Sequence, residues 1–403
     1  MPRRMMPIIH EVDSRAPVPQ GATEDSPFTY QRGQVMVTAV ELLKRMVDLH
    51  ASDVFIKANN SAHYRVDGQI LPSGEVLSAE DSERIANELM NKEQAEKFRR
   101  KNELDSAYTL VEGTDWERYR MNVFRERGQV SLVLRLVRKH PIDFSRLNLP
   151  EQVLQGLCNE YRGLIVVTGP AGSGKTTTLV SMVDYINSTR RSHIVTIEDP
   201  IEFIHQDKNG IINQREVGLD TDSFADALRQ VVRQSPDVIM IGEMRDLHTV
   251  AAAINAAETG HLVLTSLHTL HPTQTVERMI NFYPPYQRDE VRMQLSFVLR
   301  GVVSLRLVPR ADGKGRVPAV STMIVTQNVR QLIQEGKLNE IRDAIRAGEY
   351  HGMQSFDQCL ILLYKEGLIN FEDAVAASDS PGDFKLHAKG IRSESEPVGA
   401  GVK

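Results

Sequence analysis

The spacing of apolar positions along the chain changes near residue 160, and the change predicts two structured domains. Residues 35–140 begin with apolar residues at helical spacing and continue in short alternating segments, which predicts a small α+β domain. In residues 161–320, continuous apolar runs alternate with helical patterns. This alternation is typical of a parallel sheet with crossover helices. The predicted fold class is therefore α/β, with a parallel-sheet core behind a smaller domain.

The remaining segments predict connections and tails. Residues 141–160 begin as a proline-bounded linker without a strong period, and residues 321–388 read as mostly helical. Residues 1–34 and 389–403 combine small, charged and proline residues without periodicity. Such segments cannot bury enough apolar surface to fold, so we predict disordered tails at both ends.

Turn and capping residues predict the individual elements of the small domain. Asp67 and Gly68 stand between two alternating segments, which predicts a β-hairpin. Ser78 to Asp81 (SAED) is a capping box that predicts one charged helix running to about Arg100. Three strands are then predicted, in the order LDSAYTL, WERYRMNVF and VSLVLRLV.

An arginine cluster is expected on the last two of these strands. If they form a hairpin, Arg118 lies opposite Arg135, with Arg120 diagonal to it. Like charges that face each other destabilise a sheet, so such a cluster usually meets an anion. The spacing leaves two choices open, an acid on a neighbouring strand such as Asp105 or a phosphate from outside the domain.

Composition narrows the function class. The 403 residues carry a net charge of -5, so no global field favours nucleic acid. The two cysteines, Cys158 and Cys359, are far apart in sequence, which excludes a cysteine-rich zinc site and predicts buried thiols. No apolar run is long enough to span a bilayer, and the first residues lack the apolar stretch of a signal peptide. We therefore expect a cytoplasmic protein, with any membrane association coming through a partner.

The strongest chemical signal is a phosphate-binding loop. TGPAGSGKTTT follows a buried apolar strand and precedes a helix, which is the setting a Walker A loop requires. Its backbone amides and the helix N-terminus can hold phosphate oxygens, Lys175 can reach the β- and γ-phosphates, and Thr176 can ligate Mg²⁺. The residues predicted to bind ATP are Gly169, Pro170, Ala171, Gly172, Ser173, Gly174, Lys175, Thr176 and Thr177.

Acids follow the next two predicted strands. TIEDPIEF carries Glu198, Asp199 and Glu202, and a carboxylate at this edge can orient the attacking water; a solvated acidic loop is the alternative. In DVIMIGEMRD the position where P-loop enzymes usually place an Asp is Gly242, and the acid is Glu243. Glu243 can reach the same Mg²⁺ shell, or it is an ordinary loop acid.

A histidine ends the following strand. In TGHLVLTSLHTLHP, His268 lies where it could sense a γ-phosphate by hydrogen bonding, although a structural role explains it about as well. The spacing of His261, His268 and His271 matches no metal signature.

Taken in order, GPAGSGKTTT, TIEDPIEF, IGEMRD and TGHLVLTSLHT resemble the Walker A, Asp-box, Walker B and His-box motifs of the secretion ATPases of type IV pili and type II secretion. The Gly-Glu ending of the Walker B strand is that superfamily's own form. The resemblance covers nearly all of residues 35–385. The early start of the small domain, ASDVFIK, and the C-terminal GMQSFDQCL resemble the twitching-motility (PilT/PilU) branch.

This resemblance implies a RecA-like P-loop core behind a PAS-like domain, in a hexameric ring. In such rings the PAS-like domain of one subunit closes the nucleotide site of the next. Arg120 and Arg135 match the arginines that act in trans, Glu202 the acid that activates water, Glu243 the Walker B acid and His268 the His-box residue. The implied cofactors are ATP and Mg²⁺, with Thr176 and Glu243 at the metal. The implied partners are an inner-membrane pilus platform protein and a sibling pilus ATPase.

The function expected from the sequence is an ATP-hydrolysing hexameric motor for type IV pilus retraction. One departure bears on it, because retraction ATPases carry an Ala-Ile-Arg-Asn-Leu motif where this chain has NVRQL, Asn328 to Leu332. An accessory pilus ATPase subunit with low turnover therefore stays open. A type II secretion or DNA-uptake ATPase and a nucleotide kinase are further alternatives, although the kinase would need a lid that the sequence does not reveal.

Overall fold

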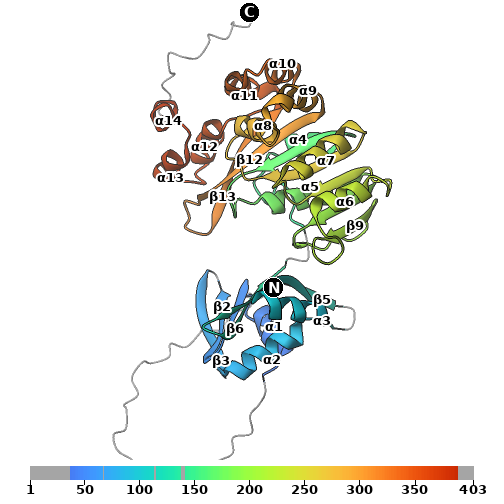
Figure 1. Ribbon diagram of the computed structural model, residues 1–403. Helices are drawn as coiled ribbons and strands as arrows, with labels where there is room; N and C mark the ends of the chain where they lie inside the picture. Colours follow the sequence, from blue (N-terminus) through green and yellow to red (C-terminus); the bar gives the residue numbers. More distant parts are fainter. Residues whose placement is uncertain (1–36, 67, 113–114, 138–140, 389–403) are drawn as a thin grey trace, which may run out of the picture. The chain divides into compact units, whose positions relative to one another are not determined.

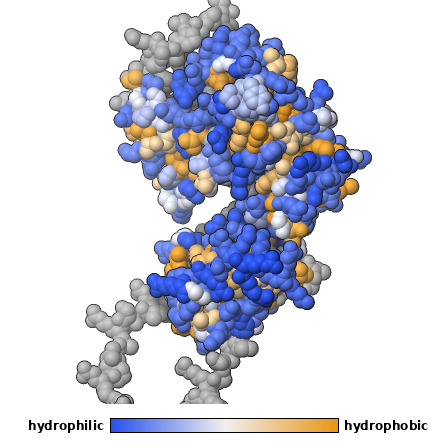
Figure 2. Space-filling model, in the orientation of Figure 1, coloured by the Kyte–Doolittle hydropathy of each residue, from blue (hydrophilic) through white to orange (hydrophobic). Residues whose placement is uncertain are grey.

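The computed structural model of the protein describes residues 37–66, 68–112, 115–137 and 141–388 (Figure 1). The predicted tails, residues 1–34 and 389–403, lie outside these residues. In the described part, the strands form two sheets, one N-terminal and one in the core. Polar residues cover most of the visible surface, with smaller apolar areas between them (Figure 2). Among the described residues, no helix is long and apolar enough to cross a membrane.

The N-terminal sheet has six antiparallel strands in the order β3-β2-β1-β6-β5-β4. The strands are β1 (Asp53–Lys57), β2 (Asn60–Val66), β3 (Gln69–Leu77), β4 (Glu103–Glu112), β5 (Asp115–Glu126) and β6 (Gln129–Leu136). Helices α1 (Ala39–Asp48), α2 (Ala79–Leu89) and α3 (Lys92–Lys101) accompany them. The predicted hairpin of β2 and β3 is confirmed, since Val66 pairs with Gln69; Asp67 of its turn is outside the described residues.

The single helix predicted from Ser78 to Arg100 is wrong, because the chain forms two helices there. Ser78 caps α2 through the predicted box with Asp81. Helix α2 ends at Leu89, the backbone of Met90 is extended, and Asn91 then opens a second capping box with Gln94. Asn favours a cap over a helix interior, because its side chain accepts from the N3 amide. Asn91 and Gln94 are therefore the sequence signal for the start of a second helix.

The predicted register of β5 and β6 is also wrong, by two residues. A two-residue turn with positive φ at both Arg127 and Gly128 joins the strands, so Glu126 pairs with Gln129. As a result Arg120, and not Arg118, lies directly opposite Arg135. A shift of two residues preserves the face on which a side chain lies, so these arginines remain on one face.

The core sheet has seven strands in the order β13-β12-β7-β11-β10-β8-β9. All neighbours pair in parallel except β12 with β13. The strands are β7 (Gly163–Thr168), β8 (His193–Glu198), β9 (Ile211–Glu216), β10 (Val238–Ile241), β11 (Leu262–Leu267), β12 (Leu299–Pro309) and β13 (Arg316–Ile324). The predicted parallel sheet is thus confirmed, with β9 at one edge and an antiparallel strand at the other.

Helices cover both faces of this sheet. They are α4 (Glu151–Cys158), α5 (Lys175–Thr189), α6 (Phe224–Val231), α7 (Leu247–Glu258), α8 (Pro272–Asn281) and α9 (Arg288–Val298), followed by α10 (Gln327–Gln334), α11 (Ile341–Ala347), α12 (Phe356–Lys365), α13 (Phe371–Ala377) and α14 (Pro381–Ala388). Short 3-10 turns occupy Pro285–Gln287, Leu338–Glu340 and Glu349–His351. The C-terminal region is helical from α10 onward, as predicted, but β13 crosses the predicted start of this region at residue 321 and ends at Ile324.

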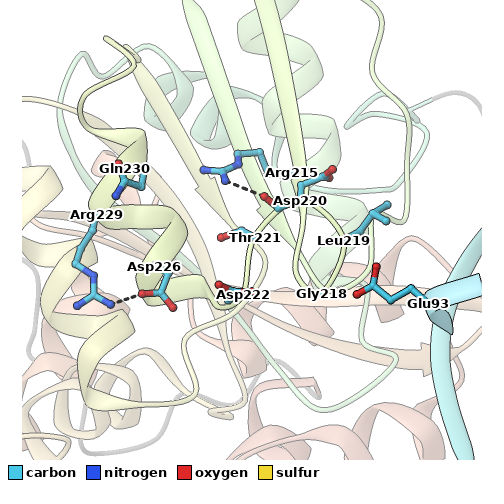
Figure 3. Close-up of a pocket in the computed structure, with 10 residues that line it drawn as sticks. All are labelled: Glu93, Arg215, Gly218, Leu219, Asp220, Thr221, Asp222, Asp226, Arg229 and Gln230. Atoms are coloured by element: carbon cyan, nitrogen blue, oxygen red, sulfur yellow. Dashed lines mark hydrogen bonds and ion pairs between the residues drawn. The ribbon is translucent and has the colours of Figure 1, made fainter. Parts of the chain in front are cut away.

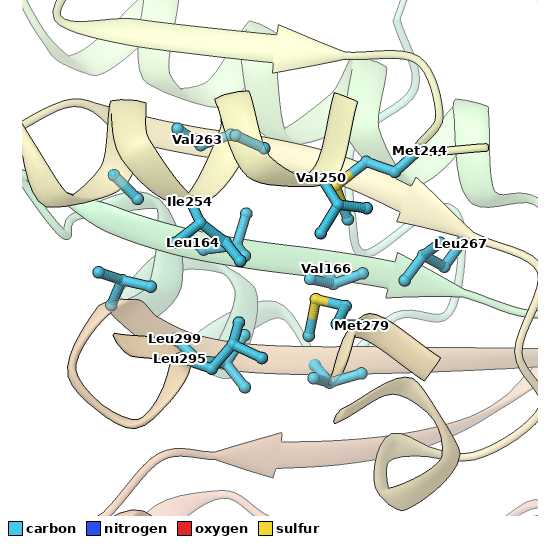
Figure 4. Packing of buried hydrophobic residues seen from close by; sticks show 14 of the residues in the cluster. Leu164, Val166, Met244, Val250, Ile254, Val263, Leu267, Met279, Leu295 and Leu299 are labelled. Atoms are coloured by element: carbon cyan, nitrogen blue, oxygen red, sulfur yellow. The ribbon is translucent and has the colours of Figure 1, made fainter. Parts of the chain in front are cut away.

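Strand β7 lies inside the sheet and is buried on both faces, which explains why its sequence is a continuous apolar run. Leu164 and Val166 pack into one cluster with Val250 and Ile254 of α7 (Figure 4). Ile165 and Val167 of the same strand pack into a second cluster, which contains residues of α4 and α5. Because successive side chains of a strand point to opposite faces, a strand covered on both sides needs apolar residues at every position.

Candidate active site

Four predicted motifs meet at one edge of the core sheet. Strands β7, β11, β10 and β8 are successive neighbours and all run in parallel, so their carboxyl ends lie at the same edge. The loop from Gly169 follows β7, His268 follows β11, Glu243 lies just beyond β10 and Glu202 lies four positions beyond β8. The order of the strands therefore collects residues that are far apart in sequence.

The loop after β7 has the backbone of an anion cradle. Gly169, Gly172 and Gly174 have φ of 145°, 72° and 98°, which lie in the region that L side chains rarely adopt. Helix α5 begins directly afterwards at Lys175. The first amides of a helix have no partner within it and carry partial positive charge, so this end suits phosphate.

Replacing Gly169 with alanine should destabilise the fold more than the same change at Gly172. A Cβ at Gly169 would lie 2.4 Å from the carbonyl oxygen of Leu305, whereas one at Gly172 meets nothing within 4 Å. Both changes strain a positive φ, at about 1 kcal/mol, and the clash adds about 2 kcal/mol at Gly169. Urea unfolding without nucleotide measures this difference, and equal losses for the two variants would contradict it.

Lys175 is the centre of a chain of contacts across the strand ends. Its Nζ lies 3.0 Å from the carbonyl oxygens of both Gly169 and Pro170, and 3.3 Å from Nδ1 of His268. Nε2 of His268 in turn lies 2.9 Å from Oε2 of Glu243. Walker A, His box and Walker B are thus joined by direct side-chain contacts.

These contacts fix the proton on His268. An ammonium can only donate, so Nδ1 accepts from Lys175 and Nε2–H donates to Glu243. Burial, followed by the charges of Lys175 and Arg245, lowers the pKa of His268. Burial also lowers the pKa of Lys175, against the opposing effect of Glu202. His268 is therefore a neutral relay between the P-loop lysine and the Walker B acid.

Arg245 is a residue of this edge that the sequence reasoning missed. It forms an ion pair with Glu243, and its Nη1 lies 3.7 Å from Oδ2 of Asp199. It links the Asp-box segment to the Walker B acid. Its place two residues after Glu243 in IGEMRD was the available signal, because side chains just beyond neighbouring strand ends face the same crevice.

Glu202 lies on the segment that follows β8, and its side chain is 41% exposed. A partly exposed carboxylate at this edge can contact water, which any group that activates water must do. A cavity of about 410 Å³ is lined in part by Ser173, Gly174 and Thr177 of the P-loop, together with residues that include Arg146, Asn148, Leu305, Arg316 and Pro318. Its volume falls within the range of small-molecule sites.

Glu198, at the end of β8, differs sharply from Glu202. It is 3% exposed and accepts hydrogen bonds from Oγ1 of Thr196 (2.7 Å) and Nε2 of Gln214 (3.1 Å). Burial raises its pKa from 4.5 to about 7, against the opposing effect of these hydrogen bonds. Two acids four residues apart thus lie in different surroundings, one buried and the other partly exposed.

Replacing Glu198 with glutamine should make stability less dependent on pH. Between pH 4.5 and about 7 the unfolded chain releases a proton that folded Glu198 retains, so rising pH weakens the wild-type fold across that window. Glutamine keeps the acceptor oxygen and cannot titrate. We expect the variant to gain about 3 kcal/mol relative to wild type between pH 4.5 and 7.5. Denaturant unfolding at both pH values checks this, and a pH-independent difference would refute it.

The N-terminal arginines share one face of their own sheet. Nε of Arg135 lies 2.8 Å from Oδ1 of Asp53, and Nε of Arg65 lies 3.1 Å from Oδ2 of the same carboxylate. Asp53 is 3% exposed. Asp105, the acid that the sequence suggested as a partner for the arginines, instead accepts a hydrogen bond from Nδ2 of Asn122. The strand order β2-β1-β6 produces this pairing, which sequence spacing alone did not reveal.

Comparison with known proteins decides the family. A family model described as "Type II/IV secretion system protein" matches residues 31–358, which is most of the chain. The chain belongs to this family. The resemblance stated from the four motifs is thus confirmed, together with the RecA-like fold and the ATPase class.

Relatives of this secretion ATPase match over nearly their whole length. The type IV pilus ATPase PilU of Pseudomonas aeruginosa is 40% identical over 357 residues, covering 88% of this chain and 92% of PilU. The pilus retraction ATPase PilT of the same organism is 39% identical over 348 residues, covering 85% of this chain and 99% of PilT. A crystal structure of the retraction motor PilT with bound ADP superposes with a TM-score of 0.80 at 42% identity, covering 86% of this chain and 98% of that chain.

The donor set of this secretion ATPase fits Mg²⁺ bound chiefly through a nucleotide. Thr176 lies in the first turn of α5, and Glu243 is a largely buried carboxylate at the same edge. Within the part of the chain that the structure describes, no three acidic, His or Cys side chains gather as a metal site. One hydroxyl and one carboxylate, completed by phosphate oxygens and water, is a common arrangement for Mg²⁺.

Proposed function

We propose that this secretion ATPase is a hexameric ATP-driven motor for type IV pilus retraction in twitching motility. The observation that carries the proposal is the chain of contacts from Lys175 through His268 to Glu243. It gives the P-loop and the Walker B acid a direct means of responding to the same nucleotide. The similarity to PilU and PilT over nearly their full lengths supports the pilus assignment.

The residues have distinct roles in this mechanism. The amides of residues 169–177 and the ammonium of Lys175 hold the phosphates, and the cavity beside Leu305 receives the nucleoside. Glu202 orients and deprotonates the attacking water. His268 donates to Glu243 and fixes its carboxylate. Thr176 and Glu243 would hold Mg²⁺, which neutralises developing charge on the phosphates when bound.

A neighbouring subunit completes the site in this proposal. Arg120 and Arg135 share one face of the N-terminal sheet, so together they can present positive charge to a phosphate. Residues 35–140 serve as the PAS-like domain that carries them, residues 141–160 as the linker, residues 161–320 as the motor core and residues 321–388 as the helical C-terminal region. Closure of each site then rotates one domain against another, and the ring pulls on the inner-membrane pilus platform from the cytoplasm.

The two alternative functions are an accessory pilus subunit and an ATPase of type II secretion or DNA uptake. The changed motif Asn328 to Leu332 lies on α10 and favours an accessory subunit that assists a sibling ATPase. The intact set Lys175, Glu202 and Glu243 favours turnover by this chain itself. A role in type II secretion or DNA uptake would show in transport assays of strains that lack the chain, with pilus retraction unchanged.

The experiment that tests the proposal is phosphate release per subunit from Mg-ATP, measured over a wide range of protein concentration. A site shared between subunits predicts a rate per subunit that rises steeply with concentration and levels off when rings form. Sizing at each concentration identifies the ring. Bound ATP without turnover at any concentration would overturn the motor and favour the accessory subunit.

A further inference from the structure

Side chains of the edge strand β9 form hydrogen bonds with the segment that carries Glu202. Strands β8 and β9 are parallel neighbours, with Thr196 opposite Gln214 and Glu198 opposite Glu216. Gln214 and Glu216 are two residues apart, so their side chains lie on the same face of the strand. Both point to the segment that runs from Ile201 to His205.

Gln214 makes three hydrogen bonds that together fix this segment. Its Oε1 accepts from the backbone amide of His205 at 2.7 Å. Its Nε2 donates to the carbonyl oxygen of Phe203 at 2.7 Å and to Oε1 of Glu198 at 3.1 Å. Both the oxygen and the nitrogen of this side-chain amide are therefore hydrogen-bonded. The amide links the end of β8 to the backbone on the C-terminal side of Glu202.

Further bonds hold the N-terminal side of the same segment. The amide of Ile201 donates to Oε2 of Glu216 at 3.2 Å, and Glu198 accepts a hydrogen bond from the backbone amide of Glu202 itself. Ile201 and Phe203 are 7% and 6% exposed. The backbone on both sides of Glu202 is thus anchored, while its carboxylate remains partly exposed.

The segment is also tied to the helix that follows the P-loop. Nδ2 of Asn187, on α5, donates to the carbonyl oxygen of Gln206 at 2.8 Å, and its Oδ1 accepts from the amide of Lys208. Asn187 is fully buried. The segment that carries Glu202 is therefore hydrogen-bonded both to β9 and to α5, the helix that follows the P-loop.

Neighbours of Gln214 on β9 point away from this segment. Arg215 donates from Nη2 to the carbonyl oxygen of Asp220 at 3.0 Å, in the loop after the strand (Figure 3). Oδ1 of Asn213 lies 2.8 Å from Nε2 of His193. These alternating contacts provide a matched control, because Asn213 is an exposed amide on the same strand that does not touch the Glu202 segment.

We propose that Gln214 is a positioning residue for ATP hydrolysis, which holds Glu202 in place to activate water. The proposal rests on the function proposed above for Glu202. In the part of the chain that the structure describes, Gln214 forms its hydrogen bonds with His205, Phe203 and Glu198 and none with the P-loop, so its effect should fall on the chemical step and not on ATP binding. A misplacement of about 1 Å in a catalytic group can lower a rate about 10²-fold.

The test compares Gln214→Leu, Gln214→Glu and Asn213→Ala in the full chain, with kcat and KM for ATP measured from pH 6 to 8.5. We expect Gln214→Leu to lower kcat by about 10- to 100-fold with KM nearly unchanged, and Asn213→Ala to match wild type. Gln214→Glu should be slow at high pH and recover as pH falls, because a protonated carboxyl regains a donor towards Phe203 or Glu198. Amide hydrogen exchange should also show faster exchange at His205 in Gln214→Leu.

The outcomes separate this inference from the proposed function. An active wild type beside an equally active Gln214→Leu would overturn the positioning role alone. A rise in KM without a fall in kcat would do the same. If Gln214→Leu does not fold, the pH series of Gln214→Glu decides, and its failure to recover at low pH counts against the role. A wild-type chain without Mg-ATP hydrolysis as an assembled ring would remove the proposed function and this inference with it.

Discussion

Replacing Lys175 with alanine is expected to reduce Mg-ATP hydrolysis by about 10²- to 10³-fold. The change removes the charge that meets the β- and γ-phosphates. It also removes the contact to Nδ1 of His268 and so cuts the link between the P-loop and Glu243. Phosphate release at saturating ATP measures the effect, together with titration of a fluorescent ATP analogue.

Lys365 provides the control for this prediction. It is an exposed lysine in the last turn of α12, so Lys365→Ala removes the same charge away from the strand ends. The control should keep wild-type turnover. A Lys175→Ala protein that folds and hydrolyses ATP at more than about a tenth of the wild-type rate would contradict the assigned site.

Replacing Arg120 with alanine should lower turnover by on the order of 10³-fold while leaving ATP binding nearly intact. Arginines that approach the phosphates only as the transition state forms act on the rate more than on binding. Arg120 lies opposite Arg135, whose guanidinium is held by buried Asp53, so loss of Arg120 leaves its partner's anchor in place. Measuring kcat and KM for ATP separates the two effects.

Arg100 is a suitable control in the same domain. Its side chain is 80% exposed on α3 and meets Glu96 only at 3.9 Å. Arg100→Ala should therefore behave as wild type in both stability and turnover. Similar turnover in Arg120→Ala and Arg100→Ala would mean that Arg120 does not act on the nucleotide.

The core could be predicted from the sequence because its signals are local. Strands β7 and β10 are nearly continuous apolar runs, and the P-loop needs its glycines within a few residues of Lys175. Parallel pairing then places the ends of successive strands at one edge without further information. For the same reason the family could be stated from four short motifs.

What could not be predicted depends on turns and on pairing between distant strands. The register of β5 and β6 depends on the length of the turn at Arg127 and Gly128, and the apolar pattern of the strands does not specify that length. Asp53 meets Arg135 only through the pairing of β1 with β6, which are far apart in sequence. No sequence motif marks Gln214, because its proposed role depends on its hydrogen bonds to the backbone of Phe203 and His205.

The central claim is that neighbouring subunits build each ATP site together, and mixing two inactive variants tests it most directly. Lys175→Ala and Arg120→Ala are each nearly inactive alone in this account. In rings assembled from equal amounts, about a quarter of the interfaces join an intact P-loop to an intact Arg120, so turnover should return to a comparable fraction of the wild-type rate. Mixed rings that form, as shown by differently labelled subunits eluting together, and still release no phosphate would contradict the shared site.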